Sequence, residues 1–201
     1  SLNIENIKKT KSNLDYPSQL FINGKYQKSI SKKSFENISP IDGKVVNHVS
    51  FAEQEDVDLA VSKAKEAFNK GYWSNLSPGE RKKILLKFAI LLERDRLELS
   101  LLDTIDMGKT INDTYNADLP TSIDNIEWYA EIIDKLFDDI SPSSKEYLGL
   151  ITKEPIGVVA AIVPWNYPLW MAIWKIAPAL ITGNSVILKP AEQSPMSAIK
   201  I

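Results

Sequence analysis

The chain has 201 residues, of which 44% are hydrophobic and 25% charged, a balance typical of a soluble globular protein and not of a disordered or fibrous one. Its 24 Lys and Arg residues stand against 26 Asp and Glu residues, and this net charge of −2 predicts no nucleic-acid surface and no polybasic membrane anchor. Because the sequence holds no cysteine and a single histidine, we expect no disulfide, no thiol nucleophile, no metal site and no Ser-His triad in these residues.

The first half of the chain predicts short strands followed by helices. Residues 20–52 have the turn signals and short apolar runs of strands, with Asn23-Gly24 as a hairpin turn and His48 as a polar residue on a half-exposed strand. No apolar run of signal-peptide length precedes them, so we expect a cytoplasmic protein.

Four amphipathic helices are predicted next. Apolar residues recur at helical spacing over residues 54–70, from the capping box Ser77-Pro78-Gly79-Glu80 onward, over 95–107, and over about 117–138. The first of these is expected to pack through a face that includes Val57 and Val61, and the last through a stripe that ends at Phe137. Residues 146–154 then predict an extended strand that ends at Pro155.

Residues 156–188 form an apolar segment of 33 residues whose only charge is Lys175. A membrane hairpin is one interpretation, but three prolines, a central Asn166 and the lack of an adjacent basic cluster favour a buried unit. In that unit, residues 156–163 form a strand, 170–182 a crossover helix and 185–188 a second parallel strand. The fold class is therefore α/β.

Polar side chains gather only where these two strands end. Asn166 follows the first strand, and Lys189 and Glu192 follow the second, at the edge where open α/β sheets bind ligands. A solvated ion pair and a turn residue are equally good explanations of these three side chains. The glycines never take the spacing of the common dinucleotide fingerprint.

Several segments together resemble the aldehyde dehydrogenase superfamily. They are LFINGKY, SPIDGKVV, FNKGYW, LLDTIDMGKT, EPIGVVAAIVPWNYPLW and WKIAPALITGNSVILKPAEQSP, in this order along essentially the whole chain. The segment WYAEIIDKLFDDI resembles the γ-glutamyl-γ-aminobutyraldehyde dehydrogenases of putrescine breakdown most, with betaine aldehyde dehydrogenases next.

This resemblance implies oxidation of a small aldehyde to a carboxylic acid with NAD. In the family, a Cys thiolate attacks the aldehyde, an Asn amide stabilises the oxyanion, and a Glu-activated water hydrolyses the thioester. Asn166 matches the oxyanion donor, and Lys175 matches a lysine implicated in proton relay. A buried lysine would need a partner or a route to solvent.

The resemblance also assigns residues to a cofactor-binding surface and to a substrate tunnel. The cofactor would lie on Ile162, Val163, Pro164 and Trp165, with its adenosine ribose held by Lys189 and Glu192, whose carboxylate disfavours a 2′-phosphate and hence NADP. The substrate tunnel would be lined by Tyr167, Trp170, Met171 and Trp174, although bulky residues on a buried helix more often belong to the core.

The resemblance divides the chain into three parts. Residues 1–140 would be the strands and helices of the cofactor-binding domain, 141–155 one strand of an oligomerisation arm whose partner strand is missing, and 156–201 an incomplete Rossmann-like βαβ unit. The catalytic Cys and the general-base Glu would lie beyond Ile201, so we expect this chain to be inactive alone. The expected assembly is a homo-oligomer, a dimer or tetramer, and a non-catalytic assembly module is the alternative function.

Overall fold

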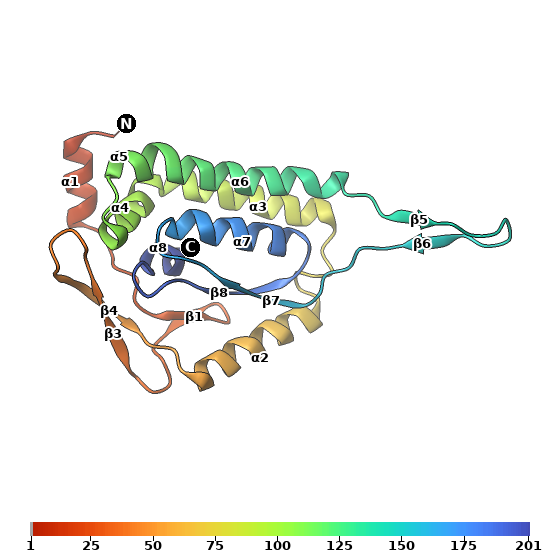
Figure 1. Ribbon diagram of the computed structural model, residues 1–201, viewed down its shortest axis with the longest axis horizontal. Helices are drawn as coiled ribbons and strands as arrows, with labels where there is room; N and C mark the ends of the chain where they lie inside the picture. Colours follow the sequence, from red (N-terminus) through yellow and green to blue (C-terminus); the bar gives the residue numbers. More distant parts are fainter. Residues whose placement is uncertain (1) are drawn as a thin grey trace.

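The structure is a computed structural model that describes residues 2–201, and it combines a helical layer with a small parallel sheet (Figure 1). Its helices are α1 (Ile4–Ser12), α2 (Gln54–Lys70), α3 (Pro78–Arg94), α4 (Arg96–Met107), α5 (Ile111–Asp113), α6 (Leu119–Ile132), α7 (Pro168–Ile181) and α8 (Met196–Lys200), with a π-helical turn η1 (Thr114–Asp118) and a 3-10 turn η2 (Ile133–Lys135). Its strands are β1 (Leu20–Ile22), β2 (Lys25–Gln27), β3 (Ser34–Ile38), β4 (Val45–Ser50), β5 (Asp139–Ser141), β6 (Gly149–Ile151), β7 (Val158–Ile162) and β8 (Ser185–Lys189).

The predicted helix ends are confirmed where a capping residue or a glycine defines them. Ser77 caps α3 with Glu80 in a reciprocal capping box. Gly71 and Gly108 end α2 and α4 in the left-handed conformation, with φ of 72° and 73°. Helix α1, which begins at the cap Asn3, was not among the predicted helices.

The last predicted helix of the first half is shorter than expected. It begins as η1, continues as α6 and ends in η2, after which Leu136 takes an extended conformation. Phe137 is therefore 79% exposed, and the prediction that it continues the buried stripe is wrong. The earlier members of the stripe, Ile123 and Ile126, are buried.

The apolar segment forms the predicted βαβ unit. Strands β7 and β8 pair in parallel, in a register that sets Val158 opposite Ser185 and Ile162 opposite Lys189, and α7 connects them. Helices α7 and α2 lie on opposite faces of this two-stranded sheet, and α3 and α6 form an outer layer over α7 (Figure 1). Among the helices described in residues 2–201, none combines the length and the hydrophobicity that a membrane-spanning helix needs.

The main core lies between α7 and the outer helices. Its buried side chains come from α3, α4, α6, α7 and β7, and those of α6 and α7 include the fully buried Leu119, Ile126, Leu169 and Ile173. The predicted packing face of α2 is only partly covered: Val57, Val61 and Ala67 are exposed, whereas Ala60, Ala64 and Phe68 are half-buried. The prediction that Val57 and Val61 pack inward is therefore wrong.

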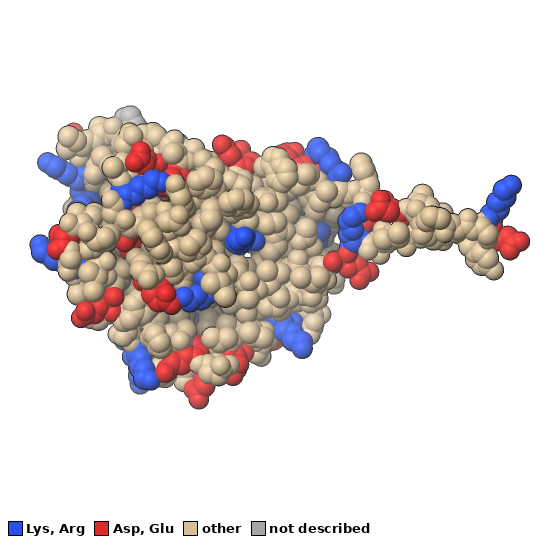
Figure 2. All heavy atoms as spheres, in the orientation of Figure 1, with Lys and Arg blue, Asp and Glu red and all other residues tan. Residues whose placement is uncertain are grey.

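Residues 139–151 form a hairpin that projects from the body of the molecule (Figure 1). Strand β5 pairs antiparallel with β6, with Ile140 opposite Leu150. The expectation that β6 lacks its partner strand is therefore wrong, since the partner lies immediately before it in the chain. Between its root and its tip the hairpin surface carries almost no charge (Figure 2).

Candidate functional site

The parallel register brings the ends of β7 and β8 to one rim. Ile162 and Lys189 are direct neighbours across the sheet, and the Val163 amide donates to the Lys189 carbonyl oxygen at 3.2 Å. Beyond the strands, the Ser194 hydroxyl donates to the Trp165 carbonyl oxygen at 3.0 Å. This hydrogen bond joins the two loops that carry the predicted polar residues, at the edge of the sheet where open α/β sheets bind ligands.

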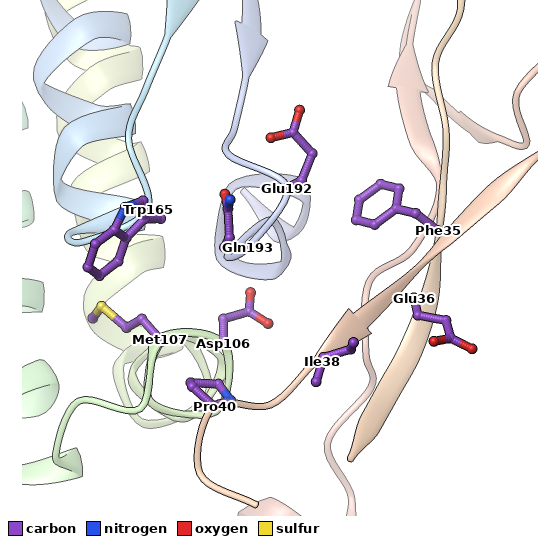
Figure 3. A pocket seen from close by; sticks show the side chains of 9 residues that line it. All are labelled: Phe35, Glu36, Ile38, Pro40, Asp106, Met107, Trp165, Glu192 and Gln193. Atoms are coloured by element: carbon purple, nitrogen blue, oxygen red, sulfur yellow. The ribbon is translucent and has the colours of Figure 1, made fainter. Parts of the chain in front are cut away.

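A pocket of about 410 Å³ opens beside these loops (Figure 3). Two predicted site residues, Trp165 and Glu192, line it from the loops after β7 and β8. Gln193, next to Glu192, also lines the pocket. The other lining residues come from β3, from the turn after β3 and from the end of α4: Phe35, Glu36, Ile38, Pro40, Asp106 and Met107. These six residues were not predicted, because they are distant from the two loops in sequence.

Asp106 supports this pocket from below. One carboxylate oxygen accepts a hydrogen bond from Asn37 Nδ2 at 2.7 Å, and the other accepts from the Met196 amide at 2.8 Å. Burial raises the pKa of Asp106 to about 6, although both hydrogen bonds oppose that rise. The carboxylate thus ties β3 to the start of α8, directly after the Lys189–Glu192 loop.

Lys189 and Glu192 form an ion pair at 2.5 Å, and their side chains are 52% and 58% exposed. The hydrogen bond from the Lys189 ammonium is the main cause that holds the pKa of Glu192 below its ordinary value. An exposed pair of this kind contributes little to stability, typically about 0.2–1 kcal/mol. Both groups remain accessible to a ligand that offers hydroxyl groups.

The predicted cofactor wall is partly open. Ile162 is 72% exposed and Trp165 is 56% exposed, Pro164 is exposed, and Val163 is buried. Asn166 is exposed in the loop before α7. Exposed apolar side chains thus follow β7 in the sequence as far as Asn166, and Ile162 lies across the sheet from Lys189, which forms the ion pair with Glu192.

The four predicted tunnel residues share one face of α7 and its preceding turn. Tyr167 and Trp170 meet edge to face, with ring centroids 5.2 Å apart, and Trp170 stacks on Trp174 at 6.5 Å. Tyr167, Trp170 and Met171 are half-buried and Trp174 is exposed. The face that fills the core is a different one, which carries Leu169, Ala172 and Ile173.

Lys175 is exposed, and its ammonium lies 5.9 Å from the centre of the Trp174 ring. It therefore has the route to solvent that a lysine in an apolar segment requires. Within residues 2–201, no group of three or more His, Cys, Asp or Glu side chains is placed to hold a metal ion.

Comparison with known protein families matches residues 26–201 to the aldehyde dehydrogenase family. NADP/NAD-dependent aldehyde dehydrogenase PuuC of Escherichia coli (strain K12) is 44% identical over 184 residues, which are 92% of this chain and 37% of that protein. The chain belongs to the aldehyde dehydrogenase family, and it spans well under half the length of this relative.

Two solved structures show how closely the fold agrees. Indole-3-acetaldehyde dehydrogenase AldA of P. syringae, in complex with NAD+ and IAA, is 46% identical with a TM-score of 0.96, over 100% of this chain and 40% of that one. The γ-glutamyl-γ-aminobutyraldehyde dehydrogenase of Burkholderia cenocepacia J2315 is 43% identical with a TM-score of 0.95, over 99% of this chain and 40% of that one. The α/β fold of the N-terminal part of the family, expected from the motifs, is confirmed.

Proposed function

We propose that this chain supplies the adenosine-binding half of a nicotinamide cofactor site, and the oxyanion donor, to an NAD-dependent oxidation of an aldehyde to a carboxylic acid. The observation that carries this proposal is the common rim at the ends of β7 and β8, where Trp165 and Glu192 line one pocket. Binding at the carboxyl ends of parallel strands is the general rule for such sheets.

The residues at this rim suit a dinucleotide. The exposed Ile162 and Trp165 offer an apolar bed, and the accessible Lys189–Glu192 pair offers a donor and an acceptor to the two ribose hydroxyls. When bound, NAD would accept the hydride that the aldehyde carbon loses. Asn166 would donate its amide N–H groups to the carbonyl oxygen as negative charge develops there.

We assign the role of substrate wall to the half-open aromatic face of α7, with Tyr167, Trp170, Met171 and Trp174. Two of the relatives described above are named for oxidising aldehydes or a γ-glutamyl aminoaldehyde. The substrate class we favour is accordingly a small aminoaldehyde, as in putrescine breakdown. Lys175, exposed beside Trp174, is the group we assign to proton relay toward solvent.

Binding of NAD to the 201-residue protein tests the cofactor half of this proposal. Isothermal titration with NAD should show saturable binding that weakens about tenfold in Lys189→Met, because one hydrogen bond from a charged donor is lost. Lys145→Met, at the tip of the projecting hairpin, is the matched control and should bind like the parent. Absence of any heat or thermal stabilisation at millimolar NAD would leave only the assembly function described next.

The projecting hairpin supports a second function, assembly. Ile140, Tyr147, Leu148 and Leu150 are all more than 60% exposed on it, and a short two-stranded hairpin with apolar side chains in water favours association. We propose that the hairpin pairs copies of the protein into a dimer or tetramer. Light scattering should show a smaller particle for Ile140→Ser/Leu150→Ser, and an unchanged mass in this variant would exclude the hairpin as the contact.

The oxyanion role of Asn166 has its own test in a protein that includes the thiol nucleophile. Asn166→Ala should lower turnover by roughly a hundredfold while the affinity for NAD stays nearly the same. Unchanged turnover would remove Asn166 from this role.

A further inference from the structure

Lys109 and Asp118 form a partly buried ion pair outside the pocket described above. The Lys109 ammonium lies 2.7 and 2.6 Å from the two carboxylate oxygens of Asp118, whose side chain is only 3% exposed. Lys109 follows Gly108 at the end of α4, and Asp118 closes η1, where the helix departs from α-helical geometry. π-Helical turns of this kind often occur at functional sites.

The same ammonium lies over the face of the Tyr167 ring, 4.1 Å from its centre. Tyr167 is the residue directly after Asn166 and the N-cap of α7, and its carbonyl oxygen accepts the first hydrogen bond of that helix, from the Met171 amide at 2.8 Å. The ring also meets Trp170 in an edge-to-face arrangement, with ring centroids 5.2 Å apart. The Tyr167 ring therefore contacts both a cation and an indole.

We propose that Lys109 is a positioning residue that fixes Tyr167, and through it the backbone that presents Asn166, with Asp118 holding the ammonium in place. We call the contacts of Asp118 with Lys109 and of Lys109 with Tyr167 the clamp. The proposal rests on the proposed function only in giving Asn166 a role; the contacts of the clamp do not depend on that function. Asp118 fixes the cation, the cation fixes the ring, and the ring fixes the turn between β7 and α7.

The Lys109 ammonium contacts the Tyr167 ring as well as the Asp118 carboxylate, so the pair links the segments after α4 to the N-cap of α7. Asp118 accepts both hydrogen bonds in a bidentate manner, and yet the ammonium still covers the ring face, the geometry of a cation–π contact. Lys82 is also partly buried, but it pairs with two carboxylates and, within residues 2–201, makes no cation–π contact: it joins α3 to Glu131 on α6 and to Asp134. It serves as the matched control.

Hydrogen exchange at the Met171 amide, measured by NMR on the 201-residue protein, reports opening of the first turn of α7. The double variant Lys109→Met/Asp118→Asn removes the cation without leaving a buried charge unpaired. Exchange at Met171 should become about tenfold faster, the change expected when a partly desolvated cation–π contact is lost. Lys109→Arg should retain near-parental exchange, because it keeps a cation over the ring.

Two further variants separate the clamp from general stability. In Lys82→Met/Asp134→Asn, exchange at Met171 should stay within about twofold of the parent. In a Tyr167→Leu background, removal of the Lys109–Asp118 pair should produce no further acceleration. Unchanged exchange in Lys109→Met/Asp118→Asn, or an equal acceleration with and without the Tyr167 ring, overturns the proposal.

Titration of NAD into the same samples distinguishes failure of this proposal from failure of the proposed function. If NAD does not bind but exchange at Met171 follows the expected pattern, the cofactor proposal fails and the clamp remains. If NAD binds and the exchange pattern is absent, the clamp fails alone. Should Lys109→Met/Asp118→Asn not fold, Lys109→Arg and Tyr167→Leu still decide the outcome, since a clamp requires the former to be neutral and the latter to accelerate exchange.

Discussion

Replacement of Asp103 by Asn should stabilise the protein more as the pH rises. Asp103 lies on α4 beside the start of α8, almost fully buried, and neither of its carboxylate oxygens has a hydrogen-bond partner within residues 2–201. The Ser197 hydroxyl and the Leu169 amide lie close enough to lower the pKa somewhat, but burial prevails and raises the pKa of Asp103 to about 7, with Asp106 adding to the rise.

The size of the effect follows from that pKa. Between its ordinary value of 3.8 and about 7, the folded protein keeps a proton that the unfolded chain has released, so the free energy of unfolding falls as the pH rises. The folded pKa is raised by about three units, each of which corresponds to about 1.4 kcal/mol, so the full loss is about 4 kcal/mol above pH 7. The amide of the Asp103→Asn variant would be neutral throughout and would escape this loss.

Urea denaturation of the parent and of Asp103→Asn at pH 5 and pH 8 measures the difference. At pH 5 the protein has lost only part of the stability that it loses between pH 3.8 and about 7. The stability advantage of the variant should therefore be about 3 kcal/mol larger at pH 8 than at pH 5. Asp124→Asn, at an exposed position of α6, is the control and should show no such trend. An advantage of Asp103→Asn that does not widen with pH would show that Asp103 is not buried in protonated form.

Three further predictions concern the site and the elements that position it. Leu169→Ala should lower the free energy of unfolding by about 2–5 kcal/mol in denaturant titrations, because a fully buried side chain at the start of α7 leaves a cavity; a loss below about 1 kcal/mol would mean that the surrounding core collapses into the space. Ser77→Ala should cost about 1 kcal/mol, since it removes the acceptor of the capping box with Glu80, and an unchanged thermal midpoint would contradict that cap. Glu192→Gln should raise the affinity for NADP relative to NAD by about tenfold in calorimetry, because the charge that repels a 2′-phosphate is gone, and equal ratios in parent and variant would remove Glu192 from the ribose site.

Elements whose signals are local could be predicted from the amino-acid sequence. The capping box at Ser77 and the glycines after α2 and α4 fixed helix ends within a residue or two, because caps act through hydrogen bonds inside one turn. The predominantly apolar sequence of residues 156–188 predicted the βαβ unit. A strand that is covered on both faces has apolar residues at successive positions and does not alternate apolar with polar ones. With that unit came the rim and the placement of Asn166, Lys189 and Glu192 after the strands.

The residues that surround that rim come together through packing of distant segments and could not be predicted from local patterns. Asp106 and Phe35 reach the pocket from elements far away along the chain, and no periodicity connects them to Trp165. Local patterns also failed at Phe137, whose helical spacing continues after the backbone has left the helix at Leu136. Likewise, the contact between Lys109 and Tyr167 joins the segment after α4 to the N-cap of α7, two places that are far apart in the sequence and that no local pattern connects.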